Sequence, residues 1–429
     1  MASTTATSMT KIAAASFAGA MLESYDFFIF GTASALVFGP LFFPLADPFA
    51  ETMASFATFG VGFLARPIGG IVFGHIGDRI GRKSALITTL LIMGIGTFLI
   101  GLLPTYKTGG VLAPIMLILL RLIQGFGLGG EYAGAALLTI EHADEGRRGF
   151  WGSLPQAAAS GGILLATGMF SLVSRLPEKA LMSWGWRIPF LASMALLIVG
   201  MFIRLNVTET PDFERAKRSE SNTRPPLVTL LQNHLRNVVL AFGARLAETV
   251  ASNIINAFGI AYVSAQLVMN RSVPLTGMLI ASSIGIGMCP AFGALSDRFG
   301  RRLVYVGGAA FMAVFAFPLF VLLGTRTASL IWLAMVVAYN FGPTMMFAVQ
   351  TTFFSELFGT SVRYTGLSIA YQVSAIVGGF TPLVATALFK ADGGAPWMVA
   401  GSLCGISLLS LLSALFVRKD STRHYSHEL

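Results

Sequence analysis

The chain has 429 residues, of which 55% are hydrophobic and 11% are charged. An ordinary soluble domain carries about 25% charged residues, so the composition predicts an integral membrane protein. The formal net charge of +9 does not indicate a nucleic-acid partner, because the sequence has no zinc-finger spacing, RNP-like motif or basic helix. The two cysteines, Cys289 and Cys404, lie in apolar stretches and predict neither a disulfide framework nor a metal site.

Apolar runs separated by charged or Gly/Pro-containing breaks predict twelve membrane-spanning helices. In the first half we expect them at 16–39, 55–77, 85–104, 111–138, 152–174 and 187–206. In the second half we expect them at 237–268, 275–296, 303–324, 329–354, 364–389 and 395–417. The sequence therefore divides into a first bundle (1–206), a polar linker of mixed charge (207–236) that we expect in the cytoplasm, and a second bundle (237–429).

The distribution of Lys and Arg predicts the orientation of these helices. If the N-terminus is cytoplasmic, 19 of the 29 Lys and Arg residues fall on inner segments and 7 fall on outer loops or outer helix ends. Positive residues accumulate on the cytoplasmic side of membrane proteins. An even number of spans also requires both ends to lie on one side. We therefore expect both termini in the cytoplasm.

A ten-residue pattern occurs twice, once in each half. Residues 74–83 read GHIGDRIGRK and residues 293–302 read GALSDRFGRR, so both fit G-x-x-x-D-R-x-G-R-[K/R]. A second pair of segments, 141–148 and 356–363, repeats a Glu and an Arg seven residues apart. Repeats at similar offsets, with equal numbers of spans between them, predict two parallel six-helix halves with a substrate site between them near the membrane midplane.

These features resemble the major facilitator superfamily. Four further stretches resemble its metabolite:proton symporter branch, which includes shikimate, α-ketoglutarate, citrate and proline/betaine permeases: ESYDFF from Glu23, GFLARPIGG from Gly62, RLIQGFGLGGE from Arg121 and WGWRIP from Trp184. The run 54–83 and the stretch YQVSAIVGGFTP from Tyr371 look most similar to shikimate-type permeases.

The resemblance implies an all-α membrane protein with twelve transmembrane helices in two six-helix bundles. It further implies a secondary transporter of the bacterial inner membrane, not an enzyme, that imports a small organic anion together with H⁺ by alternating access. We expect no cofactor other than the proton as coupling ion, no partner other than the substrate and the lipid bilayer, and function as a monomer.

Seven ionisable residues fall well inside the predicted spans. A charge at mid-bilayer costs about 2.5–3.5 kcal/mol on insertion scales, so such groups are normally paired and functional. At about 1.5 Å rise per residue, three of them lie near the membrane midplane in the first half: Asp26, Arg66 and Arg121. One open reading is that they form ion pairs which only hold helices together, such as Asp26 with Arg66 or Arg121, and Arg245 with Glu248. The seven are Glu23, Asp26, Arg66, Arg121, Glu131, Arg245 and Glu248.

The functional reading starts from the charge balance, because four acids and three arginines leave one acid in excess. Glu23 and Asp26 share a helix face and are expected to titrate as a coupled pair; with Glu131 they are the candidate proton-coupling residues. We expect the substrate carboxylate to compete with Asp26 for Arg66 or Arg121, since arginine offers a planar fork to a carboxylate. Protonation of Asp26 would then release the arginine to the substrate.

Other polar residues within the spans are candidates for contacting the rest of the substrate. Each one alone is more often a helix-packing contact than a ligand contact. The candidates are Tyr25, Gln124, Arg245, Asn256, Asn340, Tyr371 and Gln372.

The repeated motif is predicted to act as a cytoplasmic gate and not to bind substrate. We expect Asp78 to cap the start of the eleventh span or to pair with a basic residue across the bundle interface. Its counterpart Asp297 should do the same near the fifth span. The motif residues assigned to this gate are Gly74, Asp78, Arg79, Gly81, Arg82, Asp297 and Arg298.

Two other transport functions stay open: a zwitterion symporter of the proline/betaine type, and an exporter. The proline/betaine branch carries a long charged C-terminal extension, whereas about 12 residues follow the last predicted span here, so we favour an organic acid. The membrane arginines favour the same substrate class. A receptor or enzyme would need a soluble domain or a catalytic constellation, and 207–236 is too short for either.

Overall fold

The computed structural model describes residues 2–80, 82–129, 140, 143–205, 230, 232, 234–358 and 363–417. For residues 2–16, 18, 74–80, 82, 83, 85, 86, 145, 203–205, 363 and 364 it describes the backbone and not the side chains. Throughout the described ranges the regular secondary structure is helical. The residues outside the described ranges include most of the predicted linker and the last part of the predicted fourth span; they are 1, 81, 130–139, 141, 142, 206–229, 231, 233, 359–362 and 418–429.

In its described residues the first half contains six long helices and short helices between some of them. The long ones are α1 (Ala2–Leu36), α3 (Pro48–Ile80), α4 (Arg82–Leu102), α6 (Leu112–Leu128), α8 (Arg148–Val173) and α10 (Ile188–Leu205). The short ones are α2 (Phe38–Phe42), α5 (Tyr106–Gly109), η1 (Glu145–Arg147), α9 (Glu178–Ser183) and η2 (Gly185–Arg187). Each predicted span of this half overlaps one long helix, and residues 130–138 of the fourth span lie outside the described residues.

The second half, as far as the structure describes it, contains four continuous long helices and two that change helical type part-way. The continuous ones are α15 (Ser272–Phe299), α16 (Arg301–Gly324), α19 (Arg363–Ala391) and α20 (Trp397–Phe416). The seventh span consists of α13 (Leu235–Asn253), the π segment η3 (Ile254–Phe258), α14 (Gly259–Ala261) and the π segment η4 (Tyr262–Gln266). The tenth consists of α17 (Ala328–Tyr339), the π segment η5 (Asn340–Thr344) and α18 (Met345–Ser355).

The helices are built to cross a lipid bilayer. Among the described residues, nine are long and apolar enough to do so, and two shorter apolar stretches, Ile87–Leu102 and Leu112–Leu128, accompany them. Large apolar side chains cover the outer surface, including Ile71, Phe202 and Val314, which are 70%, 70% and 77% exposed. In water such a surface would be unstable, whereas it matches the hydrocarbon interior of a membrane. The chain is therefore a multi-pass membrane protein.

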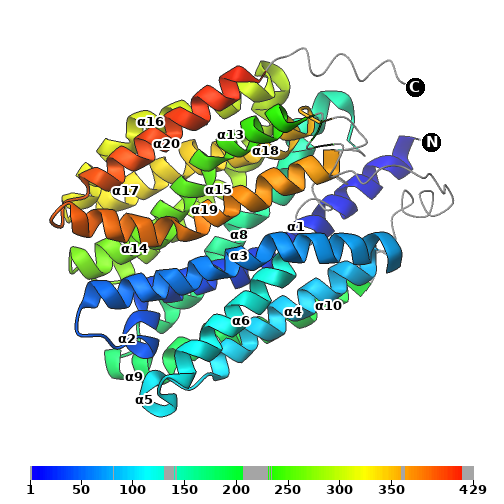
Figure 1. Ribbon diagram of the computed structural model, residues 1–429. Helices are drawn as coiled ribbons and strands as arrows, with labels where there is room; N and C mark the ends of the chain where they lie inside the picture. The colour runs from blue at the N-terminus through cyan, green and yellow to red at the C-terminus, as the bar shows by residue number, and fades with distance from the viewer. Residues whose placement is uncertain are drawn as a thin grey trace.

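The long helices gather into two bundles that lie side by side (Figure 1). α1 begins and α20 ends at the same end of the molecule, while α2, α5 and α9 lie at the other end (Figure 1). The bundles contact each other mainly where α3 packs on α19 and where α8 packs on α15. Two pairs of helices therefore form the seams along which the halves meet, with the remaining space between them.

Close glycine contacts explain the α8–α15 seam. A Cβ atom on Gly149 would lie 2.5 Å from the carbonyl oxygen of Gly293, and one on Gly293 would lie 2.6 Å from the carbonyl oxygen of Gly149. Only residues without a side chain allow the two backbones to approach this closely. A different requirement applies to Gly300, whose φ of +95° turns the chain between α15 and α16. This explains the second glycine of the repeated motif.

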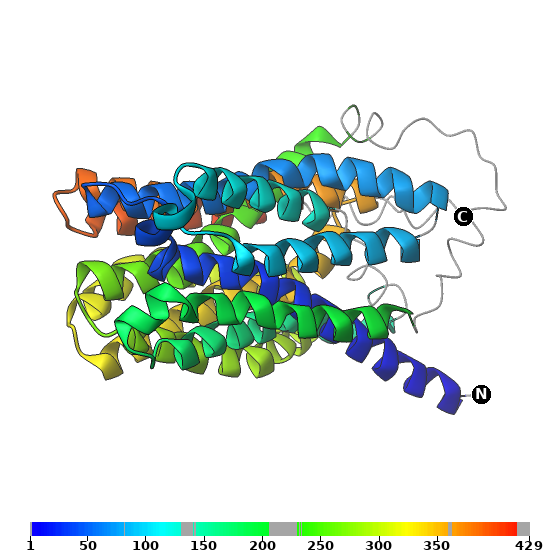
Figure 2. The ribbon, with the colours of Figure 1, turned by 90° about the horizontal axis from the view of Figure 1, so that it is seen from below.

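Several helices extend further than the apolar pattern predicts. α1 has 35 residues and begins at Ala2, and α3 has 33 residues and begins at Pro48. At about 1.5 Å per residue each is roughly 50 Å long, well beyond the roughly 30 Å hydrocarbon core. Figure 2 shows the first turns of α1 projecting beyond the bundles. Hydrophobicity marks only the part of a helix that lies in lipid, so it misses the polar ends.

A candidate transport site between the two bundles

A central cavity of about 160 Å³ lies between the halves. Helices of both bundles contribute its walls: α1, α3, α6 and α8 from the first, and α13, α15, α17, α18 and α19 from the second. Its polar lining consists mainly of single side chains spaced along these helices, surrounded by aromatic and small apolar residues. The principal polar and aromatic lining residues are Glu23, Phe27, Phe63, Arg66, Gln156, Ser160, Arg245, Glu248, Thr249, Ser252, Asn253, Tyr339, Phe347 and Tyr371.

A second, much smaller cavity of about 10 Å³ adjoins it within the first bundle. Arg66, Phe27, Phe63 and Leu128 line both cavities, so the two spaces share a wall. The small cavity is also lined by Asp26, Arg121 and Gln124, which are 7%, 4% and 2% exposed. A buried acid and two buried arginines from α1, α3 and α6 thus meet at one place beside the central cavity.

Aromatic rings hold the Arg121 guanidinium in place. Its central carbon lies 4.3 Å from the ring centre of Phe30, 5.0 Å from that of Phe59 and 5.4 Å from that of Phe27. These are cation–π distances, and such contacts are strongest where water is excluded. The Nε of Arg121 also donates to the carbonyl oxygen of Phe59 at 3.4 Å. The arginine is therefore a fixed positive charge in the wall of the first bundle.

Polar contacts connect Asp26 to Arg121 indirectly. Arg121 donates from Nη1 to the Gln124 side-chain oxygen at 3.4 Å, and Gln124 donates from Nε2 to the hydroxyl of Thr97 at 2.8 Å. Thr97, a fully buried residue of α4, also lies beside the Asp26 carboxyl. Within the described part of the chain Asp26 and Arg121 form no direct ion pair. The link between them instead passes through two neutral side chains.

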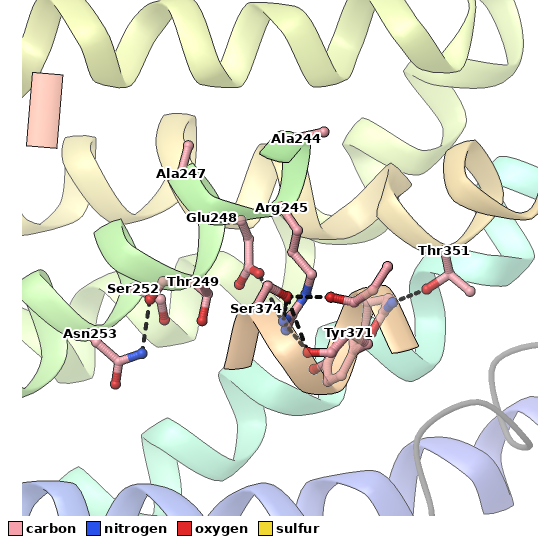
Figure 3. A network of polar contacts seen from close by, with 12 residues as sticks. Ala244, Arg245, Ala247, Glu248, Thr249, Ser252, Asn253, Thr351, Tyr371 and Ser374 are labelled. Atoms are coloured by element: carbon pink, nitrogen blue, oxygen red, sulfur yellow. Dashed lines mark hydrogen bonds and ion pairs between the residues drawn. The ribbon is translucent and has the colours of Figure 1, made fainter. Parts of the chain in front are cut away.

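The second bundle contributes an acid and a base from one helix face (Figure 3). Arg245 and Glu248 lie three residues apart on α13, with Nη2 of the arginine 3.7 Å from Oε2 of the glutamate. Arg245 also donates from Nη1 to the carbonyl oxygen of Tyr371 at 2.8 Å and to the hydroxyl of Ser374 at 2.6 Å. Its guanidinium carbon lies 3.4 Å from the centre of the Tyr371 ring. The predicted Arg245–Glu248 pair is thus present, and α19 fixes its arginine.

Comparison with known proteins decides the family. The profile described as "Sugar (and other) transporter" matches residues 11–249 and 230–418. The chain belongs to the sugar (and other) transporter family of the major facilitator superfamily. Its fold is accordingly that of twelve transmembrane helices in two six-helix bundles, as the sequence predicts, and its relatives are transporters and not enzymes.

Individual relatives of this transporter cover nearly the whole chain. It is 40% identical over 417 residues to the shikimate transporter of Escherichia coli K12, with 96% of this chain and 95% of that protein covered. It is also 40% identical over 427 residues to the inner membrane metabolite transport protein YhjE of the same organism, with 98% and 96% covered. The proline/betaine transporter of E. coli K12 is 34% identical over 428 residues, with 96% and 84% covered.

The fold also agrees with solved structures. A crystal structure of a D-xylose-proton symporter superimposes on this transporter with a TM-score of 0.72, 20% sequence identity, and 96% and 97% of the two chains covered. At this identity the agreement concerns the fold alone.

The predicted site residues of the transporter fall into three groups. Glu23, Arg66, Arg245 and Tyr371 line the central cavity. Asp26, Arg121 and Gln124 line the small cavity beside it. The other predicted binding residues, Tyr25, Asn256, Asn340 and Gln372, line neither cavity in this structure, and Glu131 lies outside the described residues.

The third group instead makes hydrogen bonds to backbone carbonyls. Tyr25 donates to Pro189 at 2.7 Å, Asn256 to Ser252 at 3.0 Å, and Asn340 to Ala281 at 3.1 Å. Gln372 donates to Gly129 across the bundle interface at 2.9 Å. Buried polar side chains usually form a hydrogen bond with a nearby group. Sequence spacing alone does not reveal which group that is. A substrate contact by any of the four stays a prediction.

The second copy of the repeated motif belongs to α15 and α16. It contacts the start of α8, which lies in the other bundle. The Asp297 carboxylate accepts hydrogen bonds from the backbone N–H groups of Gly149 at 2.7 Å and Phe150 at 2.9 Å. This is the location near the fifth span that the sequence predicts, and it is the position where a helix favours an anion. Arg298 follows Asp297 on α15, and Arg301 pairs with Glu356.

The first copy of the motif is only partly within the described structure. Gly74, Asp78 and Arg79 belong to the last turns of α3, and Arg82 begins α4, so the motif extends a helix that was predicted to end at 77. Gly81 and the side chains of Asp78, Arg79 and Arg82 lie outside the described residues. The gating role of either copy stays a prediction.

Several residues of the site were not predicted from the sequence. Thr97 gave no signal, because a threonine in an apolar helix is common and its role depends on Asp26 and Gln124 from other helices. Ser160 and Tyr339, which share a hydrogen bond of 3.0 Å between the bundles, were missed for the same reason. Glu248 is a carboxylate within a predicted span, but the sequence suggests only a pairing with Arg245 and no contact with the substrate.

Proposed function

We propose that this transporter imports a small organic acid together with a proton. The observation that carries the proposal is the small cavity of the first bundle, where Asp26, Arg66 and Arg121 meet beside the central cavity. Two buried arginines and one buried acid line this cavity, and an arginine offers a planar fork of donors that suits a carboxylate ligand. The shikimate transporter relative, with 40% identity, supports an acid as substrate class.

The proposed coupling depends on competition for the arginines. Ionised Asp26 and a substrate carboxylate would both be attracted to Arg66 and Arg121, so only one is well neutralised at a time. Protonation of Asp26 removes the competing charge and favours binding of the substrate anion. The loaded carrier, with proton and anion together, adds no net charge to the cavity and changes conformation more readily than the half-loaded one.

The proposed movement is a rocking of the two bundles about the cavity. The functional unit would be one chain in the bacterial inner membrane with both termini in the cytoplasm. The inner membrane location is supported by the metabolite transport protein relative, and the orientation is supported by the distribution of Lys and Arg.

Uptake into proteoliposomes tests this proposal. We expect an inward proton gradient to drive accumulation of at least one mono- or hydroxy-carboxylate from a panel. Asp26→Asn should abolish accumulation above equilibrium, because the side chain can no longer bind and release a proton. Exchange of labelled for unlabelled acid should continue. Accumulation that is equally fast without the gradient, or full accumulation by the variant, would contradict proton coupling.

A zwitterion is the second candidate substrate. The acid and base of α13, together with the proline/betaine transporter relative at 34% identity, favour it. Uptake of proline or betaine with no uptake of any acid in the same panel would replace the first candidate by the second.

A further inference from the structure

Glu248 has an acceptor that the described protein does not use. The residue is 7% exposed and lines the central cavity from α13. Within the described residues, its Oε2 atom has no hydrogen-bond partner, and because that atom is itself buried, a donor reaches it only if the side chain turns toward the cavity. The nearest cation, Nη2 of Arg245, lies 3.7 Å away, which is close enough for an ion pair and too far for a hydrogen bond.

Arg245 cannot close this gap easily, because the second bundle holds it elsewhere. Its Nη1 atom is engaged with the Tyr371 carbonyl and the Ser374 hydroxyl, and its plane lies against the Tyr371 ring. Both partners belong to α19, so a shift of the guanidinium toward Glu248 would break contacts between two helices. Figure 3 shows the carboxylate beside this fixed arginine.

We propose that Glu248 accepts a hydrogen bond from a hydroxyl group of the substrate, so that the preferred substrates are hydroxylated organic acids. The inference rests on the proposed function, in which the first bundle holds the carboxylate. The substrate then bridges the halves, with its carboxylate at Arg66 and Arg121 and a hydroxyl at Glu248. Thr249, Ser252 and Asn253, on the next turn of the same cavity wall, suit further hydroxyl groups.

The charge around Glu248 favours a neutral donor over an ammonium group. Arg245 already balances the carboxylate, and a second cation placed beside it would be repelled. A quaternary ammonium such as betaine has no N–H or O–H to donate at all. A buried acceptor left without a donor weakens binding of any ligand that cannot supply one, by roughly 10- to 100-fold.

The experiment compares cyclohexene carboxylates that carry three hydroxyl groups or none. Proton-driven uptake into proteoliposomes gives a KM for each acid, and wild type should prefer the trihydroxy acid by roughly 10- to 100-fold. In Glu248→Gln the preference should fall at least several-fold, because a neutral amide is a weaker acceptor than a carboxylate, while the acid without hydroxyl groups keeps its KM. Glu51→Gln, the same change at a glutamate outside the cavity, should retain the wild-type preference.

If the Glu248→Gln protein folds poorly, a second variant and a binding measurement test the same inference. Glu248→Asp keeps the charge and withdraws it by one methylene, so its preference should lie between those of wild type and Glu248→Gln. The trihydroxy acid should also raise the Tm of purified wild-type protein more than the acid without hydroxyl groups does.

Three outcomes would overturn the inference: equal KM values of the two acids in wild type, an unchanged preference in Glu248→Gln, or loss of proton-driven accumulation of both acids in Glu248→Gln with the preference intact. The last would make Glu248 a proton carrier only. Failure of the proposed function is a different result, in which wild type takes up neither acid or ignores the proton gradient.

Discussion

At the scale of single residues, the first bundle couples an acid to a base through hydroxyl and amide groups. A threonine hydroxyl has one hydrogen and two acceptor sites. In this structure the Thr97 hydroxyl donates to the Met93 carbonyl at 2.9 Å and accepts from Gln124, which leaves room for a proton from a neutral Asp26. If Asp26 is ionised, the hydroxyl must turn and donate to it. Thr97 can therefore serve both states of the acid without releasing Gln124.

We predict that Thr97→Val slows proton-driven uptake. Valine has the same shape and no hydroxyl, so the buried Gln124 amide loses the acceptor that it has in wild type, and a buried donor without a partner costs about 1–3 kcal/mol. Uptake into proteoliposomes with an inward proton gradient should therefore fall at least several-fold. Thr97→Ser keeps the hydroxyl and should retain wild-type uptake; a Val variant with wild-type uptake would remove Thr97 from the coupling.

At the scale of helices, the sequence predicts where the twelve spans lie. Long apolar runs mark the helical segments that lie in lipid, and charged or Gly/Pro-containing breaks mark where they end. The sequence also predicted the Arg245–Glu248 pair, since residues three apart share a helix face. It did not predict the π segments η3, η4 and η5. Asn256 lies in η3 and Asn340 lies in η5, and both side chains donate to backbone carbonyls. Contacts between helices, such as Thr97 with Asp26, depend on packing that no local pattern specifies.

We predict that Asp297→Ala slows the transport cycle and leaves substrate affinity nearly unchanged. The variant removes two hydrogen bonds that hold the start of α8 to α15, and loss of such a cap costs about 0.5–2 kcal/mol. The state in which this end of the bundles is closed becomes less populated, so turnover should fall by roughly 2- to 30-fold. Exchange assays in proteoliposomes measure turnover and KM separately. Asp144→Ala is the control, because Asp144 is exposed and precedes η1 without a capping bond; a higher KM at normal turnover in Asp297→Ala would place the motif in the binding site.

At the scale of the whole molecule, the two bundles are also joined at the end remote from the start of α1. Lys390 at the end of α19 donates to Asp47 at 2.5 Å, and Arg271 donates to both carboxylate oxygens of Glu178 at 2.7 and 2.9 Å. Each pair joins the first bundle to the second. Asp297, Gln372 and the glycine contacts of the α8–α15 seam join the bundles elsewhere, so both ion pairs must separate for this end to open. We infer that they hold this end of the transporter closed.

The ionic nature of this closure has a defined pH range. The hydrogen bond from Lys390 holds the pKa of Asp47 below its usual value. A lowered pKa means that the pair stabilises the closed end at pH values above the ordinary Asp pKa of about 3.9, and that the contribution is lost only as the pH falls through the lowered value. Closure should therefore be constant between about pH 5 and pH 8 and should weaken in high salt, since exposed ion pairs contribute little and are screened by salt.

We predict that Lys390→Asp with Arg271→Asp opens this end and that the reciprocal changes Asp47→Lys and Glu178→Arg close it again. Spin labels at Tyr106 and Arg326, both exposed at this end, report the separation of the halves after Cys289 and Cys404 are replaced. The first double variant places like charges opposite each other, so the population with a long distance should rise several-fold, and the quadruple variant should return it to near the wild-type value. Long distances that persist in the quadruple variant would show that specific packing, and not charge, keeps this end closed.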